Sequence, residues 1–414
     1  MEEVVGSINQ ADTAWLMVSC ALVMLMTPGL ALFYGGMVGE RNVLSTSMHS
    51  FIALGVVTLQ WVVLGYSLAF GADTGYGFVG GLEYAFLNGV GLEPQEGSTI
   101  PHLLFMAFQM MFAIITPALI SGAIAERMKF SAYILFILLW ATLVYDPICH
   151  WVWGPDGWLG ARGALDFAGG TVVHLSSGAG ALVCAMVLGR RRRPGPPHNL
   201  TLTLIGAGLL WFGWFGFNAG SALASNENAA LALVNTHLAA GAAAFSWAFV
   251  EWLKQGKPTA LGVASGLVAG LVCITPAAGF VSPTASVFMG LAAGVVCYGA
   301  VLAKGKLGYD DALDAFGIHG VGGALGAVLT GVLAAEAWGG ADGLLHGNSA
   351  LFTENVIGVL AAAAYSFVVT FVLLKLIDVT IGLRVSDEQE SEGLDTTLHG
   401  EEGYHLGGSG AMLE

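Results

Sequence analysis

Two histidines, His174 and His319, are the residues whose type and setting most clearly point to chemistry, because each lies in an otherwise apolar stretch. When the two histidines are aligned, the pairs Gly178-Ala179 and Gly323-Ala324 coincide, which places the histidines at equivalent points of a repeat. Two such imidazoles could meet and hydrogen-bond along a narrow pathway through lipid. The alternative interpretation is two separate core histidines, each bonded to a backbone carbonyl.

A carboxylate precedes the first of these histidines, at Asp166 in the sequence Leu-Asp-Phe-Ala-Gly-Gly-Thr. An acidic side chain at this point could cap the first turn of a helix, whose positive end favours it. It could also stabilise a nearby cation electrostatically. A third histidine, His237, also lies in an apolar segment but has no repeat mate, so we favour a structural role for it.

Aromatic residues gather in two apolar segments and in one loop, together with a hydroxyl; they include Phe108, Phe112, Trp153, Trp214, Phe217 and Ser221. Ring faces can hold a small cation, with about 0.5–2 kcal/mol for each contact. Stacked phenylalanines could gate a narrow dry pore. The alternative is that these rings pack or face lipid, as most aromatic side chains of membrane helices do.

The composition describes the elements that must position these residues. The chain has 414 residues, of which 56% are hydrophobic and 10% charged, whereas soluble domains carry about 25% charged residues. Its 60 glycines suit close helix packing in a bilayer. The net charge of −15 gives no reason to expect a nucleic-acid partner. The five cysteines lack metal or CxxC spacing, so we expect no disulfide, metal or other cofactor.

Eleven segments are apolar over the roughly 20 residues that a membrane-spanning helix needs. They cover about 13–36, 44–70, 101–123, 130–150, 169–188, 200–220, 229–252, 260–280, 284–303, 316–335 and 354–376. All but one of the 14 Lys and Arg residues then fall on one side, Arg162 being the exception. The positive-inside rule predicts that the N-terminus is outside and the C-terminus in the cytoplasm. The acidic start of the chain predicts no cleaved signal peptide.

The eleven segments divide into five, five and a final one. Thr116-Pro117 and Thr275-Pro276 occur at matching places of two repeat halves, about 13–188 and 200–335. Because five spans per half is an odd number, the halves must have opposite orientations, with a substrate path at their interface. The sequence therefore predicts an all-α integral membrane domain, residues 1–383, and a cytoplasmic tail, residues 384–414. By composition alone, the acidic tail would be disordered.

The longest of these motifs resemble the ammonium transporter (Amt/MEP/Rh) family, in its bacterial and archaeal Amt branch. The resemblance runs from Pro28 into the tail, and its most specific blocks are Asp166–His174, Trp214–Ser221, Asp314–Gly320 and Gly382–Ser386. It implies an outer vestibule that recruits ammonium at Phe108, Phe112, Trp153 and Ser221, a gate at Phe112 and Phe217, and a pore lined by His174, His319 and Trp214. In this comparison Asp166 is the carboxylate needed for recruitment.

The resemblance implies ammonium transport across the cytoplasmic membrane. Ammonium loses its proton, ammonia crosses a hydrophobic pore, and the net transport moves charge; methylammonium would act as an analogue. It also implies a homotrimer, an ordered regulatory tail and a nitrogen-regulatory partner protein of the PII type. Two alternatives remain open within the same fold, an ammonium sensor and an electroneutral Rhesus-type ammonia channel. A membrane enzyme is disfavoured, because the sequence has no nucleophile motif or nucleotide-binding loop.

Overall fold

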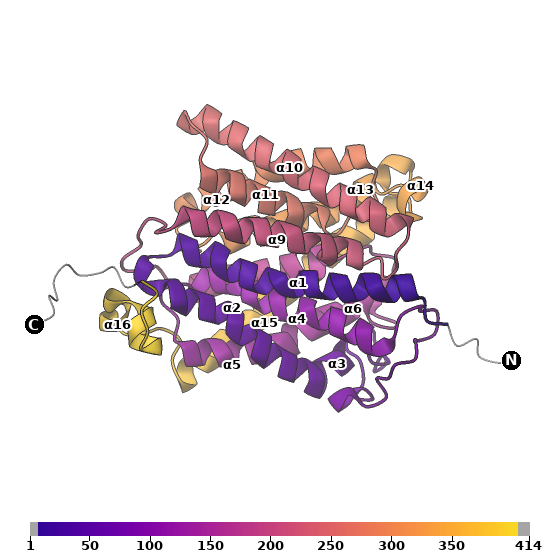
Figure 1. Ribbon diagram of the computed structural model, residues 1–414, viewed down its shortest axis with the longest axis horizontal. Helices are drawn as coiled ribbons and strands as arrows, with labels where there is room; N and C mark the ends of the chain where they lie inside the picture. Colours follow the sequence, from indigo (N-terminus) through magenta and orange to yellow (C-terminus); the bar gives the residue numbers. More distant parts are fainter. Residues whose placement is uncertain (1–6, 405–414) are drawn as a thin grey trace, which may run out of the picture.

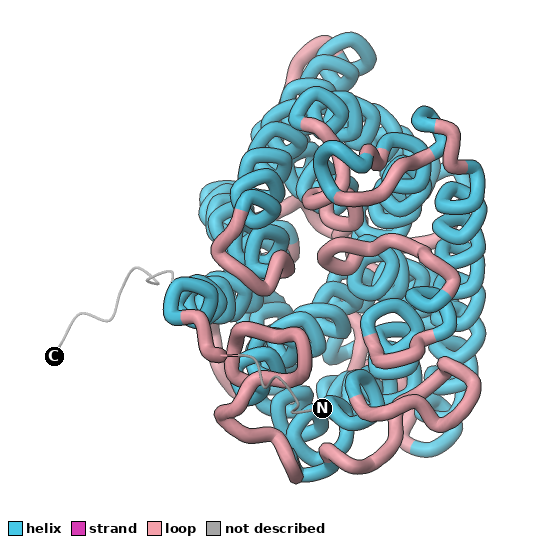
Figure 2. The backbone as a smooth tube through the Cα atoms, turned by 90° about the vertical axis from the view of Figure 1, so that its right-hand side faces the viewer, coloured by secondary structure: helices cyan, strands magenta, loops and turns pink. Residues whose placement is uncertain are grey.

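The computed structural model describes residues 7–404 of the chain, and within this part the long secondary-structure elements are all helices, with no β-strand. Most of the long helices run along the same direction, and the start of α1 and the short helix α16 lie at opposite ends of the bundle (Figure 1). Turned by 90°, the molecule shows these helices nearly end-on, with loops covering the end that faces the viewer (Figure 2). This arrangement is that of a helical bundle with two distinct ends.

Sixteen α-helices make up the described part of the chain. Their bounds are α1 Gln10–Met37, α2 Val43–Gln60, α3 Tyr66–Phe70, α4 His102–Ile124, α5 Phe130–Trp140, α6 Asp146–Trp153, α7 Trp158–Ala161, α8 Ser176–Leu188, α9 Leu200–Gly220, α10 Glu227–Gln255, α11 Ala260–Ile274, α12 Pro283–Leu307, α13 Val321–Leu333, α14 Glu336–Gly339, α15 Ser349–Thr380 and α16 Asp387–Glu392.

Ten helical segments within residues 7–404 are long and apolar enough to cross a membrane. They coincide with ten of the eleven predicted segments, several of them joining shorter helices, as in Glu40–Phe70 and Phe130–Ala161. The chain is therefore a multi-pass membrane protein. The remaining predicted segment, 260–280, contains α11, whose 15 residues span about 22 Å at 1.5 Å per residue, less than a bilayer core. Eleven crossings and the orientation of the termini stay predictions.

The chain turns after α11, at its Thr-Pro pair. Thr275 Oγ1 donates to the carbonyl of Leu271 at 2.7 Å, and Pro276 has no N–H to continue the helix. Thr116 makes the matching bond to the carbonyl of Phe112 at 2.6 Å, yet α4 continues past Pro117 to Ile124. The two Thr-Pro pairs thus make the same local hydrogen bond, but α11 ends at its pair whereas α4 continues past its pair.

Helices α1 and α9 lie side by side along the middle of the bundle and join its two halves (Figure 1). Their close approach depends on glycine, because a Cβ at Gly206 on α9 would lie 2.2 Å from the backbone N of Phe33 on α1. Small residues at such crossings allow dispersion contacts between backbones, which drive helix association in lipid. The interface fixes how the two halves face each other.

Four wide π-helical turns interrupt the membrane-spanning segments, at Trp61–Gly65, Ala141–Tyr145, Gly170–Leu175 and Phe316–Gly320. Such turns are rare and often mark functional sites. The last two turns carry His174 and His319. The first two adjoin a buried polar pair, Gln60 and Asp146.

The Gln60–Asp146 pair links α2 to α6 inside the bundle. Gln60 Nε2 donates to Asp146 Oδ2 at 2.7 Å and to Thr142 Oγ1 at 3.1 Å. Asp146 is fully buried and Gln60 is 6% exposed. Asp146 Oδ1 and Gln60 Oε1 have no hydrogen-bond partner within residues 7–404. Gln60 is therefore the only side chain in this part of the chain that donates to the buried carboxyl.

The tail is ordered over residues 384–404. Arg384 Nη2 pairs with Glu390 Oε2 at 2.7 Å, and both oxygens of Asp395 accept from the backbone at the start of α2, from Leu44 N at 3.0 Å and Ser45 N at 2.7 Å. The prediction of disorder from composition is wrong for these residues. Composition treats acidic side chains as solvated, but here Asp395 caps a helix and Glu390 pairs with an arginine. Residues 405–414 of the predicted tail lie outside the described part.

Replacing Gln60 with Leu should destabilise the protein by about 1–3 kcal/mol, because the buried Asp146 loses its donor. We expect a lower melting temperature of the purified protein in detergent. The double variant Gln60→Leu, Asp146→Leu removes both polar partners and should recover much of the loss. Equal melting temperatures for the wild type and Gln60→Leu would show that the pair contributes nothing to stability.

Candidate functional site

His174 and His319 meet in the interior of the bundle, one from each half of the chain. The two side chains belong to residues that are 1% and 4% exposed, and their Nδ1 atoms lie 3.3 Å apart. The ring centroids are 5.3 Å apart, with an angle of 22° between the planes. The structure therefore brings together the two residues that the repeat alignment places at equivalent positions.

This contact constrains how the two rings hold their protons. A hydrogen bond between two Nδ1 atoms requires that one ring donates its Nδ1–H and the other accepts. If both rings are neutral, the donor ring then has a bare Nε2 acceptor and the acceptor ring carries an Nε2–H. Within the described residues, His174 Nε2 has no hydrogen-bond partner. The pair can thus offer one acceptor and one donor to a small molecule beside it.

Asp166 caps the turn that carries His174. Its Oδ1 accepts from Gly169 N at 2.8 Å and Gly170 N at 2.7 Å, and its Oδ2 accepts from Thr171 N at 2.8 Å and Val172 N at 3.1 Å. Burial raises the pKa of this carboxyl, and the four N–H groups oppose that rise because they stabilise the charged form. The carboxylate is held rigidly at the positive end of the helix.

Asp311 makes the corresponding cap before His319, and sequence reasoning missed it. Its oxygens accept from Ala315 N at 3.1 Å and Phe316 N at 2.8 Å. Burial, followed by repulsion from Asp314, raises the pKa of Asp311 to about 6. Asp311 precedes His319 by eight residues, just as Asp166 precedes His174 by eight. This equal spacing is the feature of the sequence from which the second cap could have been predicted.

The backbone after each carboxylate also matches. Three residues beyond Asp166 and Asp311 the chain is left-handed, with φ of 110° at Gly169 and 63° at Asp314. A non-glycine residue in this region is strained unless it is held by its neighbours. Lys304 Nζ donates to the Asp314 side chain and, at 2.7 Å, to the carbonyl of Asp311, which holds the second turn in place. Both histidines are therefore presented by the same local structure.

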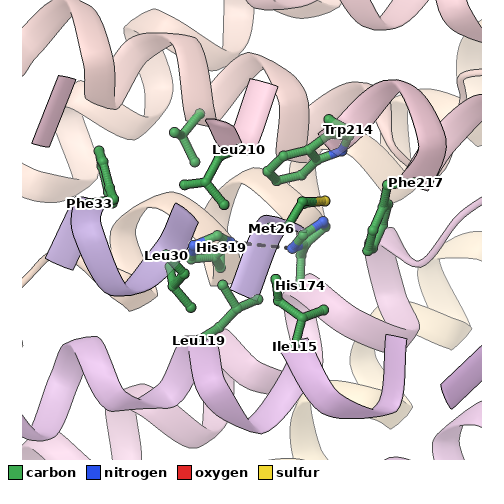
Figure 3. Close-up of a pocket in the computed structure, with 11 residues that line it drawn as sticks. Met26, Leu30, Phe33, Ile115, Leu119, His174, Leu210, Trp214, Phe217 and His319 are labelled. Carbon is green, nitrogen blue, oxygen red and sulfur yellow. Dashed lines mark hydrogen bonds between the residues drawn. The ribbon is translucent and has the colours of Figure 1, made fainter. Parts of the chain in front are cut away.

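A narrow cavity surrounds the two imidazoles and is lined by Met26, Leu30, Phe33, Ile115, Leu119, His174, Leu210, Trp214, Phe217, Val268 and His319 (Figure 3). Its volume of about 10 Å³ leaves room for about one water-sized molecule. Apart from the imidazoles and the Trp214 N–H, the lining side chains are apolar. In Figure 3 Phe217 stands beyond His174, and Phe33 stands beyond His319 at the opposite end of the row.

Trp214 forms one wall of this cavity. Its ring stacks on His174, with centroids 5.2 Å apart and 22° between the planes. Its Nε1–H donates to Thr275 Oγ1 at 2.9 Å, at the turn that ends α11. Because this N–H is already bonded, Trp214 offers the cavity an apolar face and fixes the orientation of His174.

Phe112 and Phe217 separate this cavity from a larger one. Their rings stack with centroids 4.2 Å apart and 28° between planes, and both residues are at most 1% exposed. Phe217 lines the narrow cavity, and Phe112 lines the larger one. The stacked rings of Phe112 and Phe217 therefore lie between the two cavities.

The larger cavity has a volume of about 340 Å³ and is lined by Phe70, Phe105, Gln109, Phe112, Val152, Trp153, Phe167, Ser221 and Leu223. The Trp153 ring meets Phe112 edge-on at 6.0 Å, and its Nε1–H donates to the carbonyl of Asp166 at 2.8 Å. Ser221 Oγ donates to the carbonyl of Phe217 at 2.8 Å, which leaves its lone pairs free to accept. The cavity thus combines ring faces with a hydroxyl acceptor.

The remaining predicted vestibule residue, Phe108, lies elsewhere. It is fully buried, packs edge-on against Phe112 at 4.9 Å and is not among the residues that line the larger cavity. Gln109 does line that cavity, and its buried Oε1 has no partner in the described part of the chain. Residues 7–404 contain no group of three or more His, Cys, Asp or Glu side chains that could hold a metal ion.

Comparisons with known proteins identify the family of the chain. The sequence profile of the Ammonium Transporter Family matches residues 14–404. The chain is 53% identical over 402 residues to an ammonium transporter of Bacillus subtilis, covering 96% of this chain and 99% of the relative. It is 49% identical over 400 residues to the ammonium transporter Amt1 of Archaeoglobus fulgidus, covering 96% of this chain and 100% of the relative.

Solved structures give the same result. The crystal structure of Saccharomyces cerevisiae Mep2 superposes with a TM-score of 0.87 at 37% identity, covering 92% of this chain and 89% of that one. A structure titled "Sensor Amt Protein" superposes with a TM-score of 0.88 at 29% identity, covering 94% of this chain and 98% of that one. The chain belongs to the Ammonium Transporter Family.

Proposed function

We propose that this protein carries ammonium across the cytoplasmic membrane by binding the cation in the larger cavity, removing its proton and passing ammonia along the two histidines. The observation that carries the proposal is the His174–His319 contact, at 3.3 Å, inside a cavity with room for about one water-sized molecule. Two imidazoles that can donate and accept hydrogen bonds, in so small and apolar a space, suit a neutral molecule that also donates and accepts hydrogen bonds.

The larger cavity supplies the recruitment step. Its aromatic faces at Trp153 and Phe112 can attract a small cation, each by about 0.5–2 kcal/mol. The Ser221 hydroxyl can accept a hydrogen bond from the cation, which potassium cannot donate. Ammonium is therefore favoured over potassium at the first site by its N–H groups rather than by its size.

The narrow cavity supplies the selectivity step. An unpaired charge is costly in a space that excludes its hydration shell. Ammonium escapes this cost by releasing a proton, and the resulting ammonia can hydrogen-bond to His174 and His319. Potassium cannot lose its charge and is rejected behind the Phe112–Phe217 pair.

Asp166 supplies negative charge beside the recruitment site. Its carbonyl binds the Trp153 N–H, and its carboxylate is fixed by four backbone N–H groups, so it acts on the cation through space. We include net charge movement in the proposal: the proton follows the ammonia into the cell rather than returning to the outside.

The wider assembly is part of the same proposal. The chain crosses the cytoplasmic membrane eleven times as an inverted repeat plus a final helix, with the N-terminus outside, and forms a homotrimer with one pore per subunit. The opposite placement of the start of α1 and of α16 supports an odd number of crossings (Figure 1). A PII-type regulatory protein would bind the cytoplasmic face, near the ordered tail.

A sensor is the second candidate function, because a structure titled "Sensor Amt Protein" has the same fold. In that case ammonium would bind in the larger cavity with little flux through the histidine pore. A Rhesus-type channel differs again, since it would conduct ammonia without charge movement. Flux and current distinguish the three.

Purified protein in liposomes on a solid support should give a saturating inward current after an ammonium concentration jump, and none after a potassium jump. Protein-free liposomes are the control, and the pH of the liposome lumen is followed in parallel. A rise in lumenal pH without current would indicate electroneutral ammonia conduction. Neither current nor pH change would leave the sensor as the function.

Replacing His174 with Ala should reduce the ammonium current by about five- to 150-fold, because a hydrogen bond to a buried polar group contributes roughly 1–3 kcal/mol. The matched control is His237→Ala, since His237 also lies in a long helix but is exposed and stacks on Trp211 away from the cavity. A His174→Ala current equal to that of the wild type would show that the His174 imidazole is not needed for transport and would contradict the proposed mechanism.

A further inference from the structure

The last long helix, α15, holds the loop that carries Asp166. Asn355 Oδ1 accepts from Leu165 N at 2.9 Å, and Asn355 Nδ2 donates to the carbonyl of Leu165 at 3.2 Å. Asn355 is 3% exposed. Its amide therefore satisfies both backbone groups of the residue directly before Asp166, as a neighbouring strand would.

A third bond extends this clamp to the other half of the chain. Asn355 Nδ2 also donates to the carbonyl of Ala327 at 2.8 Å, on α13, the helix that continues from His319. One buried amide thus connects the Asp166 loop with the helix of the second histidine.

The loop needs such an external support because the bonds of Asp166 are local. The four N–H groups that the carboxylate accepts all lie within six residues of it, so they shape the turn without placing it in the bundle. Between α7 and the turn at Gly170, four hydrogen bonds anchor three consecutive residues to other elements: two join Leu165 to Asn355, one joins the Asp166 carbonyl to Trp153, and one joins Phe167 N to the Pro276 carbonyl at 3.1 Å.

A neighbouring ion pair contributes less. Arg162 Nε and Nη2 bind the two carboxylate oxygens of Glu354 at 2.7 and 2.9 Å, but the Arg162 side chain is 48% exposed. Exposed pairs of this kind are screened by water and contribute little. The buried amide is the stronger of the two supports.

A small cavity makes the clamp sensitive to truncation. About 10 Å³, enough for roughly one water, lies between α15 and the loop and is lined by residues that include Asp166, Thr171 and Asn355. Shortening Asn355 to alanine would enlarge this space and leave the Leu165 N–H and carbonyl without their protein partner. The loop could then move relative to Trp153 and the His174 turn.

We propose that Asn355 is a positioning residue for ammonium recruitment: it fixes the backbone at Leu165 and so the position of Asp166, whose carbonyl accepts from the Trp153 N–H at the wall of the larger cavity. This inference rests on the proposed transport function and deepens it. An aliphatic side chain of similar volume cannot replace Asn355, because the position needs a donor and an acceptor on the same group.

The test measures ammonium-evoked currents over a range of concentrations for the wild type, Asn355→Ala and Thr353→Ala. Thr353 is the matched control, because it is exposed on the same helix and bonds only to its own helix, at the Ser349 carbonyl. Asn355→Ala removes all three hydrogen bonds of the Asn355 amide and should raise the half-saturating ammonium concentration by at least about threefold, since the net loss of even one neutral hydrogen bond is equivalent to about a two- to tenfold change. Thr353→Ala should leave it unchanged.

A second measurement separates positioning from folding. If Asn355→Ala lowers the melting temperature and the maximal current but not the half-saturating concentration, Asn355 only stabilises the fold and the proposal is overturned. If Asn355→Ala cannot be purified, Asn355→Asp replaces it, since aspartate keeps the acceptor for Leu165 N and loses the donors. The same rise in half-saturating concentration is expected, and no rise overturns the proposal.

A double variant tests whether Asn355 acts through Asp166. In the Asp166→Glu background, where the charge is kept but already displaced, adding Asn355→Ala should change the half-saturating concentration by less than it does in the wild type. Full additivity would mean independent action and contradict the proposal. A wild type with neither current nor lumenal pH change would instead refute the proposed function itself, and the positioning role with it.

Discussion

The cost of holding a charge where no water can solvate it governs the arrangement around His174 and His319. The cavity there holds about one water-sized molecule, and the stacked Phe112 and Phe217 close it on one side. Only the two imidazoles interrupt its apolar wall with groups that can bind a guest. In the proposed mechanism, this constraint lets the site distinguish a cation that sheds its charge from one that cannot, which size alone would not achieve.

The two imidazoles are positioned by the same local structure in both halves of the chain. Each histidine sits in a π-helical turn eight residues after a buried aspartate, and each aspartate caps that turn with its carboxylate. The carboxylates satisfy backbone N–H groups that would otherwise be unpaired at a helix start. The same caps place both carboxylates at the start of the turns that carry the histidines.

Contacts between distant parts of the chain hold the two histidine-bearing turns in place relative to each other. Helices α1 and α9 pack closely through small residues such as Gly206, and α15 reaches both halves through Asn355. The ordered tail adds a further link, because Asp395 caps the start of α2. The site around the two histidines is thus assembled from elements that are hundreds of residues apart in the sequence.

Much of this could be predicted from the sequence. The apolar segments located all ten long membrane helices, because length and hydropathy are local properties. The repeat alignment placed His174 and His319 at equivalent points. The early end of α11 was not foreseen, because a Thr-Pro pair ends one helix and not the other. Composition could not predict that the tail is ordered, because it does not show that Asp395 has a backbone partner 350 residues away. The cap at Asp311 escaped notice although its spacing to His319 was visible.

Asn355 illustrates a different limit. An asparagine in a long apolar helix carries no local signal for its partners, and Leu165 and Ala327 could be assigned to it only in three dimensions. Side chains that act by supporting a loop have this property in general, because their chemistry is defined by what lies opposite them.

The central claim is that the proton leaves ammonium before the nitrogen passes the histidines. The most direct measurement compares ammonium-evoked currents in H₂O and in D₂O, with a viscosity-matched H₂O solution as the control. If proton release and transfer are part of transport, the current should be clearly smaller in D₂O than in the viscosity-matched solution. Equal currents in those two solutions would mean that no proton transfer limits the current, which would contradict an account in which proton release controls passage.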